Sequence, residues 1–163
     1  MSPITELLKK DDMKYSLLLA LILSMFGCIP SDNELKVIDN EISEEVTFIL
    51  ELDTKDNSRD EVESFTQYLS DYIVEREPSI VYGYYLSGDG KKITLVETYL
   101  NSQDAIQHGI DFINGPNFDK FFEMFEIESF IVIGNVNEEF KSFSANNGFN
   151  IEYRESIGGY VRR

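Results

Sequence analysis

The stretch VETYLNSQDAIQHGIDF, residues 96–112, decides what kind of domain this chain forms. Its first residues continue an alternation of apolar and polar side chains that is typical of a β-strand over residues 92–100. An Asn-Ser pair follows, which is a common helix start, and apolar side chains then recur at helical spacing over about residues 103–113. We therefore predict a strand that carries Glu97, followed directly by a helix that carries His108.

The residues on either side of this stretch supply the other elements of the domain. VTFILELD, residues 46–53, has a period of two that places four apolar side chains on one face of a strand. The segments before and after GDG, within residues 80–100, are typical of two strands joined by a hairpin turn. The predicted order is strand 46–53, helix from about 58 to Pro78, strand 80–87, strand 92–100, helix 103–113 and strand 130–135, with short helical pieces at 117–127 and 137–148 and a candidate edge strand at 149–155.

This order predicts both a fold class and a mode of assembly. Strand, helix, strand, strand, helix, strand is the βαββαβ order of the ferredoxin-like α+β fold, in which the helices cover one face of an antiparallel sheet. The other face, which carries either Ile93, Leu95 and Tyr99 or their neighbours, must also be covered. We expect a homodimer that packs through this face as a dimeric α/β barrel.

The composition limits the classes of partner. The chain has 163 residues, of which 30 are acidic and 14 basic, and its formal net charge is -16. Aromatic residues make up 13% of it, which favours a packed core over a disordered acidic chain. Nucleic acid is excluded as a partner because binding to phosphate backbones needs clustered Lys and Arg. The acidic body also gains nothing from an anionic lipid surface.

The N-terminal part contains one short hydrophobic segment. Residues 15–29 carry no charge, and Lys9, Lys10 and Lys14 precede them. The segment is shorter than the ~20 residues of a membrane-spanning helix, and basic residues before an apolar run are typical of a secretory signal peptide. The alternative is a buried core helix, but a helix at the edge of a small domain has a polar face and this segment has none.

The only cysteine of the chain ends this segment. MFGC, residues 25–28, resembles the lipobox of bacterial lipoproteins, which implies that Cys28 is diacylated and becomes the mature N-terminus. Two acyl chains give stable anchoring, and acylation accounts for a thiol that has no partner for an internal disulfide; the alternative is a leftover buried cysteine. We expect a true start at Met13, a signal peptide at 1–27, a flexible tether at 28–45 and the folded domain at 46–163, in a protein exported to the bacterial cell envelope and held at the membrane by the lipid anchor only.

Four residues at the strand-helix junction carry a resemblance to a known family. Glu97 and Tyr99 near the end of the strand, followed by Ala105 and His108 on the helix, resemble the pattern of the antibiotic biosynthesis monooxygenase family. These are small dimeric α+β barrels that include quinol monooxygenases, and the resemblance covers about residues 46–135. It implies oxygenation of a quinol or a similar aromatic molecule without a cofactor.

The resemblance also implies roles for individual residues. His108 is the candidate base, because histidine titrates near neutral pH without help, and Glu97 is its candidate orienting partner. Tyr84, Tyr99, Phe112 and Phe122 are the candidate walls of a substrate pocket. In the alternative interpretation, His108 is a structural residue that donates to Glu97, and the aromatic residues form the core or a dimer interface.

A second class of function therefore stays open, namely a non-catalytic module that binds a ligand or a partner protein. An enzyme of this kind predicts an open pocket of ~300 Å³ or more that His108 reaches, whereas an interaction module predicts a cavity filled by side chains. With one His and one Cys the chain has no zinc or haem-attachment spacing, so we expect no metal and no cofactor. GDGKK, residues 88–92, lacks the Gly-Lys-Ser/Thr of a phosphate-binding loop.

Overall fold

The alternating stretch at residues 46–53 forms the central strand of the sheet. In the computed structural model, which describes residues 35–163, β2 (Val46–Asp53) buries every second side chain, beginning with Val46. The predicted signal peptide, the start at Met13 and Cys28 lie outside the described residues. Among residues 35–163 no helix is both long enough and apolar enough to cross a membrane.

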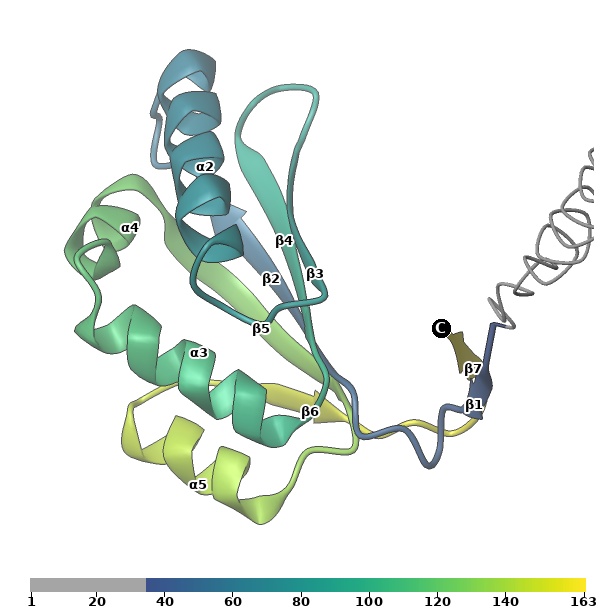
Figure 1. Ribbon diagram of the computed structural model, residues 1–163. Helices are drawn as coiled ribbons and strands as arrows, with labels where there is room; N and C mark the ends of the chain where they lie inside the picture. The colour runs from purple at the N-terminus through teal and green to yellow at the C-terminus, as the bar shows by residue number, and fades with distance from the viewer. Residues whose placement is uncertain (1–34) are drawn as a thin grey trace, which may run out of the picture. The chain divides into compact units, whose positions relative to one another are not determined.

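Five strands form the main sheet around β2 (Figure 1). The others are β3 (Val81–Leu86), β4 (Lys92–Tyr99), β5 (Glu126–Gly134) and β6 (Glu152–Arg154). They lie in the order β3-β4-β2-β5-β6, and all neighbours are antiparallel except β5 and β6. The predicted ferredoxin-like α+β fold is confirmed, and the candidate edge strand within 149–155 is the short parallel strand β6.

Four helices lie against one face of this sheet (Figure 1). They are α2 (Arg59–Val74), α3 (Ser102–Asn114), α4 (Phe118–Met124) and α5 (Glu138–Asn146). Ser58 begins α2 with a capping box, in which its side chain accepts from the backbone of Glu61 and the Glu61 carboxylate accepts from the backbone of Ser58. Asn101 caps α3 with its side-chain oxygen. Polar capping residues just before each run of helically spaced apolar residues therefore determine where both long helices begin.

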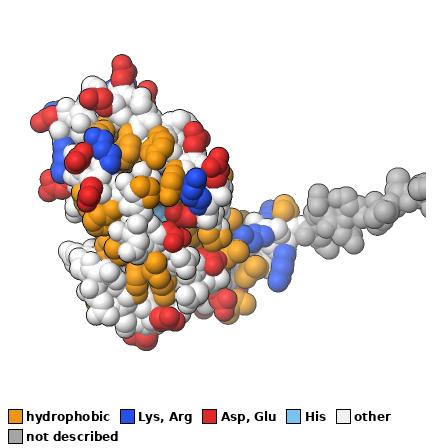
Figure 2. Space-filling view, turned by 60° about the vertical axis from the view of Figure 1, so that its left-hand side comes forward, with side chains coloured by type: hydrophobic (Ala, Val, Ile, Leu, Met, Phe, Trp, Pro, Cys, Tyr) orange, Lys and Arg blue, Asp and Glu red, His pale blue; other side chains and the backbone are white. Residues whose placement is uncertain are grey.

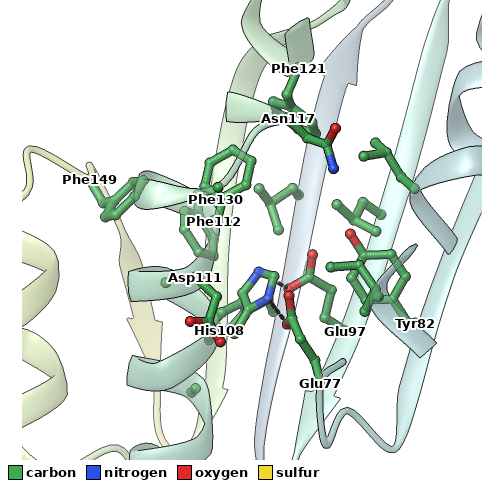
Figure 3. Close-up of a pocket in the computed structure, with 18 of the residues that line it drawn as sticks. Glu77, Tyr82, Glu97, His108, Asp111, Phe112, Asn117, Phe121, Phe130 and Phe149 are labelled. Carbon is green, nitrogen blue, oxygen red and sulfur yellow. Dashed lines mark hydrogen bonds and ion pairs between the residues drawn. The ribbon is translucent and has the colours of Figure 1, made fainter. Parts of the chain in front are cut away.

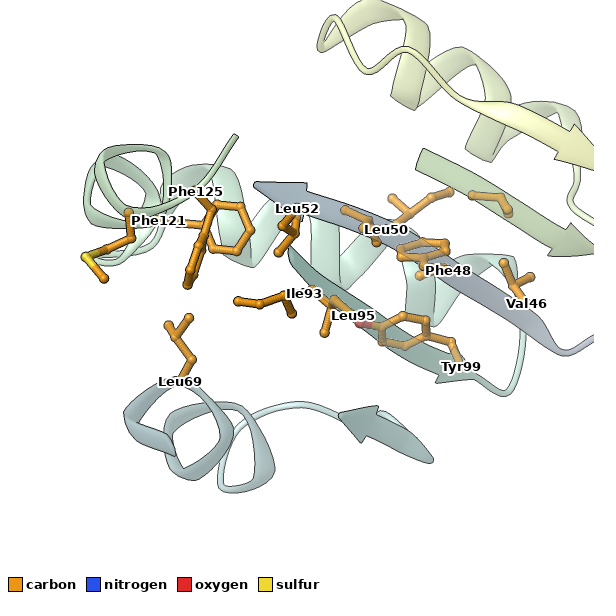
Figure 4. Packing of buried hydrophobic residues seen from close by; sticks show 14 of the residues in the cluster. Val46, Phe48, Leu50, Leu52, Leu69, Ile93, Leu95, Tyr99, Phe121 and Phe125 are labelled. Carbon is orange, nitrogen blue, oxygen red and sulfur yellow. The ribbon is translucent and has the colours of Figure 1, made fainter. Parts of the chain in front are cut away.

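The core lies between the sheet and the helices (Figure 4). β2 and β4 contribute alternate apolar side chains to it, and Phe121 and Phe125 pack against them from the region of α4. Phe121 and Phe125 are 5.3 Å apart between ring centroids. Aromatic side chains that are buried in this way contribute about 1.5–3 kcal/mol each to folding. Part of the aromatic stretch at 117–127 is therefore core, as the alternative interpretation expected.

None of the helices within residues 35–163 covers the opposite face of the sheet. Strand register puts Ile49, Val96 and Ile131 side by side at its centre, and Tyr85 on β3 is 60% exposed. Ile93, Leu95 and Tyr99 point to the helix-covered face instead, where they are almost completely buried. The open face is thus lined by their neighbours along the strand.

A second, two-stranded sheet departs from the prediction for the N-terminal region. β1 (Val37–Asp39) pairs antiparallel with β7 (Tyr160–Arg162), so three residues of the predicted flexible tether 28–45 form a strand. Backbone hydrogen bonds between Lys36 and Arg163 extend the pairing. Strands of three residues are too short to show an apolar period, and each strand pairs with one at the other end of the chain, so no local pattern predicts this two-stranded sheet.

Candidate functional site

Three ionisable side chains meet beneath the helices. His108 on α3 lies between two carboxylates: its Nδ1 is hydrogen-bonded to Glu77 Oε2, and its Nε2 lies 3.3 Å from Glu97 Oε2. Figure 3 shows both carboxylates pointing at the imidazole ring. The side chains of Glu77 and Glu97 are each 4% exposed and that of His108 is 10% exposed. We call these residues the Glu77–His108–Glu97 triad.

Each member of the triad is positioned by a different element. Glu97 is placed on the helix-covered face by the period of β4, two residues from Leu95 and from Tyr99. His108 points to the sheet from the buried face of α3. Glu77 follows the last turn of α2, and its backbone nitrogen donates to the carbonyl of Ile73, just before a proline that cannot continue a helix.

The two carboxylates control the protonation of His108. Burial by itself would lower the pKa of His108, but the charges of Glu97 and Glu77 and the hydrogen bond that His108 donates to Glu77 outweigh it and raise the pKa. The charged imidazolium is therefore favoured over a wider pH range than in a free histidine, and in this form both N–H groups are directed at carboxylates. Burial raises the pKa of Glu97, and the charge of His108 and a hydrogen bond from Tyr99 only partly oppose this rise.

Three tyrosine hydroxyls surround the triad. Tyr99 donates to Glu97 Oε2 at 2.9 Å, while the hydroxyls of Tyr82 and Tyr84 lie 3.0 Å apart. Burial raises the pKa of Tyr82, Tyr84 and Tyr99, and the charge of Glu97 raises the pKa of each further. All three hydroxyls therefore keep their protons at physiological pH, and each can donate a hydrogen bond, as Tyr99 does to Glu97.

A narrow cavity begins at the triad and runs between the helices and the sheet. Its polar end is formed by the triad with Tyr82, Tyr84 and Asp111. The rest of the wall is mainly apolar and includes Phe48, Leu50, Leu69, Leu95, Phe112 and Phe121. Figure 2 shows hydrophobic side chains gathered in the middle of one face, with acidic side chains around them. The arrangement suits a molecule with an apolar body and one polar group.

The volume of the cavity limits what enters it without movement. It is about 80 Å³, roughly half of the ~150 Å³ that holds benzene in an engineered cavity. It is also well below the ~300 Å³ expected of an enzyme pocket. By this criterion the described conformation is closer to a cavity filled by side chains than to an open active site. A ring-sized ligand therefore has to displace side chains on entry.

The predicted site residues are only partly brought together. His108, Glu97, Tyr84 and Phe112 line the cavity. Tyr99 does not form its wall: it is fully buried behind His108, with 5.2 Å between the two ring centroids. Phe122 packs on Phe112 at 6.0 Å between centroids and lines a neighbouring groove instead.

Glu77 is the member of the site that sequence reasoning missed. It is 31 positions from His108, so no local pattern connects the two residues. One signal was present in the sequence, because an acidic residue at the C-terminal end of a helix is unfavourable next to the helix dipole unless a cation compensates it. Within residues 35–163 no group of three or more His, Cys, Asp or Glu side chains is arranged to hold a metal ion.

Comparison with known proteins shows the fold and not the activity. The structure is similar to that of MupZ from Pseudomonas fluorescens, with a TM-score of 0.61 and 14% identity over 73% of this chain and 95% of that chain. A conserved protein from Methanosarcina mazei Go1 gives a TM-score of 0.45 with 18% identity over 56% of this chain and 93% of that chain. Protein SO0527 from Shewanella oneidensis gives 0.44 with 17% identity over 60% of this chain and 92% of that one. No protein-family model matches the chain, and no curated protein matches it by sequence.

Proposed function

We propose that the cavity binds a small, mostly apolar molecule that bears one ionisable hydroxyl group, and that the triad receives the proton of that group. The observation that carries this proposal is a charged His108 held between two buried carboxylates at the polar end of an apolar cavity. Buried ionisable groups with shifted pKa values in a cavity are typical of functional sites. A phenol or quinol matches both the apolar walls and the polar end.

The geometry favours Glu97 over His108 as the proton acceptor. Both ring nitrogens of His108 face carboxylates, and the raised pKa of His108 favours the form in which both nitrogens already carry a proton. The raised pKa of Glu97 brings this carboxyl closer to the value that suits a general base. In this assignment His108 stabilises the negative charge that passes from Glu97 to the ligand, so the roles implied by the family resemblance are exchanged.

The reaction class follows from the resemblance of Glu97, Tyr99, Ala105 and His108 to the antibiotic biosynthesis monooxygenase pattern. We infer that the deprotonated ring supplies electrons to dioxygen without a cofactor. In the balanced reaction one oxygen atom of dioxygen replaces the hydrogen of a ring C–H and becomes a carbonyl oxygen, while the hydroxyl group becomes the second carbonyl of the quinone. The other oxygen atom leaves as water with the two hydrogen atoms that the ring has lost. The substrate itself is the reductant.

We also propose that the protein is an exported lipoprotein of the bacterial cell envelope. This rests on the uncharged run at residues 15–29 and on the lipobox-like MFGC ending at Cys28. Mass spectrometry of the membrane-extracted protein tests the proposal directly. The expected N-terminal peptide begins at a diacylated Cys28, and an unmodified N-terminus at Met1 or Met13 would show that the proposal is wrong.

A non-catalytic binding module is the second candidate function. The cavity volume of about 80 Å³ favours it, because no ring-sized substrate fits the described conformation without movement of side chains. In this case the triad orients a bound ligand through hydrogen bonds, and its protonation changes affinity and not rate.

Oxygen uptake distinguishes the two candidates. The full chain is incubated with a panel of phenols and reduced quinols, beside Glu97→Gln, His108→Ala and Glu77→Gln. If Glu97 is the base, its loss should lower the rate at least about 100-fold. The matched control is Glu123→Gln, which changes an exposed carboxylate whose one ion pair within residues 35–163 is with Lys120.

The outcomes separate as follows. Uptake that falls in the triad variants and not in Glu123→Gln supports the oxygenase. No uptake, together with saturable binding of the same molecules measured by calorimetry, supports the binding module. Neither uptake nor binding would contradict the proposed site as a whole.

A further inference from the structure

A second hollow, called the groove from here on, lies next to the cavity at the triad. β6 pairs only with residues 131–133, so within residues 35–163 no strand lies beside the earlier half of β5 on this side of the sheet. The groove follows this free part of β5, between helices α3 and α4 and the loop that joins α5 to β6. Its volume is about 540 Å³, which lies in the range of ligand pockets, ~300–1,000 Å³.

Four side chains form a common wall between the groove and the cavity. Each of them lines both spaces, and they are Ile127, Phe130, Phe149 and Ile151. Figure 3 shows Phe130 and Phe149 on the side of the cavity away from Tyr82 and Glu77. The wall therefore closes the apolar part of the cavity and not the polar end at the triad.

Phe149 is the part of this wall that moves most easily. Ile127, Phe130 and Ile151 also pack against the buried core. Phe149 is half-buried on the loop after α5 and meets Phe130 edge-on, with 6.2 Å between ring centroids. Its N–H donates to the carbonyl of Ser144, and Gly148 has a φ of 77°, so a Schellman motif holds the backbone here. The ring can therefore rotate about its own bonds while the loop keeps its path.

We propose that the groove holds an apolar substituent of the same ligand whose hydroxyl group binds at the triad, and that the two spaces join at Phe149. The proposal rests on the proposed function and narrows its ligand class to phenols or quinols with an apolar chain on the side of the ring away from the hydroxyl. The cavity of about 80 Å³ is too small for a ring. A bound ring has to displace side chains, and the groove is the adjoining space that can receive both Phe149 and the substituent.

The lining of the groove suits such a chain. Ile113, Phe118 and Phe122 supply apolar surface from α3 and α4. The charged side chains of the lining are Glu128 and Glu152, and each forms an ion pair with a basic residue outside it. Among the described residues the groove thus offers a phosphate or carboxylate no positively charged partner. We therefore expect a neutral alkyl or prenyl chain.

Binding of a series of 4-alkylphenols to the full chain tests this assignment, with oxygen excluded so that binding and not turnover is measured. The series runs from 4-methylphenol to 4-hexylphenol. The affinity, measured by calorimetry, should rise about four-fold for each CH₂ group that the groove buries. Each compound should also shift the imidazole resonance of His108, the one histidine of the chain, because the hydroxyl stays at the triad.

Two substitutions on α3 form a matched pair. Ile113→Glu places a carboxylate in the groove, so it should abolish the gain in affinity with chain length while 4-methylphenol still binds. Ile110→Glu is the control, because Ile110 is 38% exposed on the same helix and lines neither the groove nor the cavity. This control should keep the gain.

A tryptophan in the groove gives a second measurement that removes no apolar side chain. The chain contains no tryptophan, and Asn150 is an exposed residue of the groove lining. In Asn150→Trp the emission should move to shorter wavelength with 4-hexylphenol and not with 4-methylphenol. Tyr85→Trp, on the edge strand β3 at the other side of the sheet, should respond to neither. Adding Phe149→Ala to Asn150→Trp should speed the association of 4-hexylphenol in stopped-flow measurements, because no ring then has to move.

The outcomes separate this inference from the proposed function. If every compound shifts the His108 resonance with equal affinity, the proposed function stands and the groove is rejected as the substituent site. A change of tryptophan emission without a change at His108 would make the groove a separate site, and this too would overturn the inference. An unchanged association rate in the Phe149→Ala variant would reject the passage at Phe149. If no compound binds, the proposed function fails and this inference fails with it.

Discussion

A protonated His108 is stable in the interior only because two carboxylates share its charge. With Glu77, Glu97 and His108 all charged, the triad carries one net negative charge in a largely apolar surrounding. Breaking a buried ion pair by removing one partner costs about 3–5 kcal/mol, because the other charge is left uncompensated. Because the charge of His108 depends on both carboxylates, the pKa of His108 reports on the whole triad.

At this residue scale we predict a raised pKa for His108 that can be measured without ambiguity. The chain has one histidine, so one imidazole resonance titrates in an NMR experiment. Its pKa should lie above the usual value of about 6.5, because Glu97 and Glu77 outweigh the effect of burial. A measured pKa below that value would contradict the assignment of His108 as a charged residue.

The double variant Glu77→Gln with Glu97→Gln is the control, because in it the pKa of His108 should shift in the opposite direction. Without these two carboxylates, burial is opposed only by the charge of Asp111, which has the smallest effect on His108, and should bring the pKa of His108 below about 6.5. The pH dependence of stability should reverse as well. In the wild type the contribution of His108 is fully present below about pH 6.5 and is lost as the pH rises through the raised pKa. In the double variant stability should increase as the pH rises toward about 6.5, which denaturation at a series of pH values measures.

At the scale of elements, the join between β5 and β2 depends on one close backbone approach. Gly134 ends β5 opposite Val46 and has a φ of 112°, a conformation that side chains rarely adopt. A Cβ at this position would overlap the carbonyl oxygen of Glu45. The start of the central strand and the end of β5 therefore meet only because residue 134 has no side chain.

We predict that Gly134→Ala lowers the free energy of unfolding by about 2 kcal/mol or more. Urea denaturation followed by circular dichroism measures this loss. Gly88→Ala is the matched control, because a Cβ there has open space around it and the backbone is not in the left-handed region. Equal stability of the two variants would mean that Glu45 moves away from residue 134 without cost.

At the scale of the whole molecule, the open sheet face is the one that none of the helices within residues 35–163 covers. Ile49, Val96 and Ile131 form its apolar centre, while Lys92 near one end pairs with Asp53 and Glu128. An apolar centre with a charged rim is the usual anatomy of a protein interface. We propose that a second copy of the chain covers this face.

If the protein is a dimer, a substitution in the interface should halve its mass in solution. Val96→Glu places a charge in the centre of the proposed interface but at a solvent-facing position of the monomer, so it should give a folded monomer by sedimentation equilibrium. Val74→Glu is the control, since Val74 is 76% exposed at the end of α2. A wild-type protein that remains monomeric at high concentration would show that the prediction is wrong.

The features of this protein that follow from the sequence are those encoded by the local spacing of apolar residues and by capping and turn residues. The alternation in residues 46–53 and 92–100 determines which side chains face the helices, and this includes Glu97. Helical spacing turns His108 toward the sheet, and Asn101 fixes where its helix begins. The ferredoxin-like order could therefore be predicted, because the spacing of apolar residues in each element shows whether it is a strand or a helix and which of its faces is buried.

Only the tertiary structure decided which distant groups meet. Glu77 lies 31 positions from His108, and Val37 pairs with Arg162 at the other end of the chain. Tyr99, expected at a pocket wall, became a donor to Glu97 behind the site. The size of the cavity likewise results from how many side chains fill one space. Which distant residues come into contact depends on packing and on how loops bring remote segments together across the whole fold. The local spacing of apolar residues shows which face of an element a residue lies on, but not which residue it contacts there.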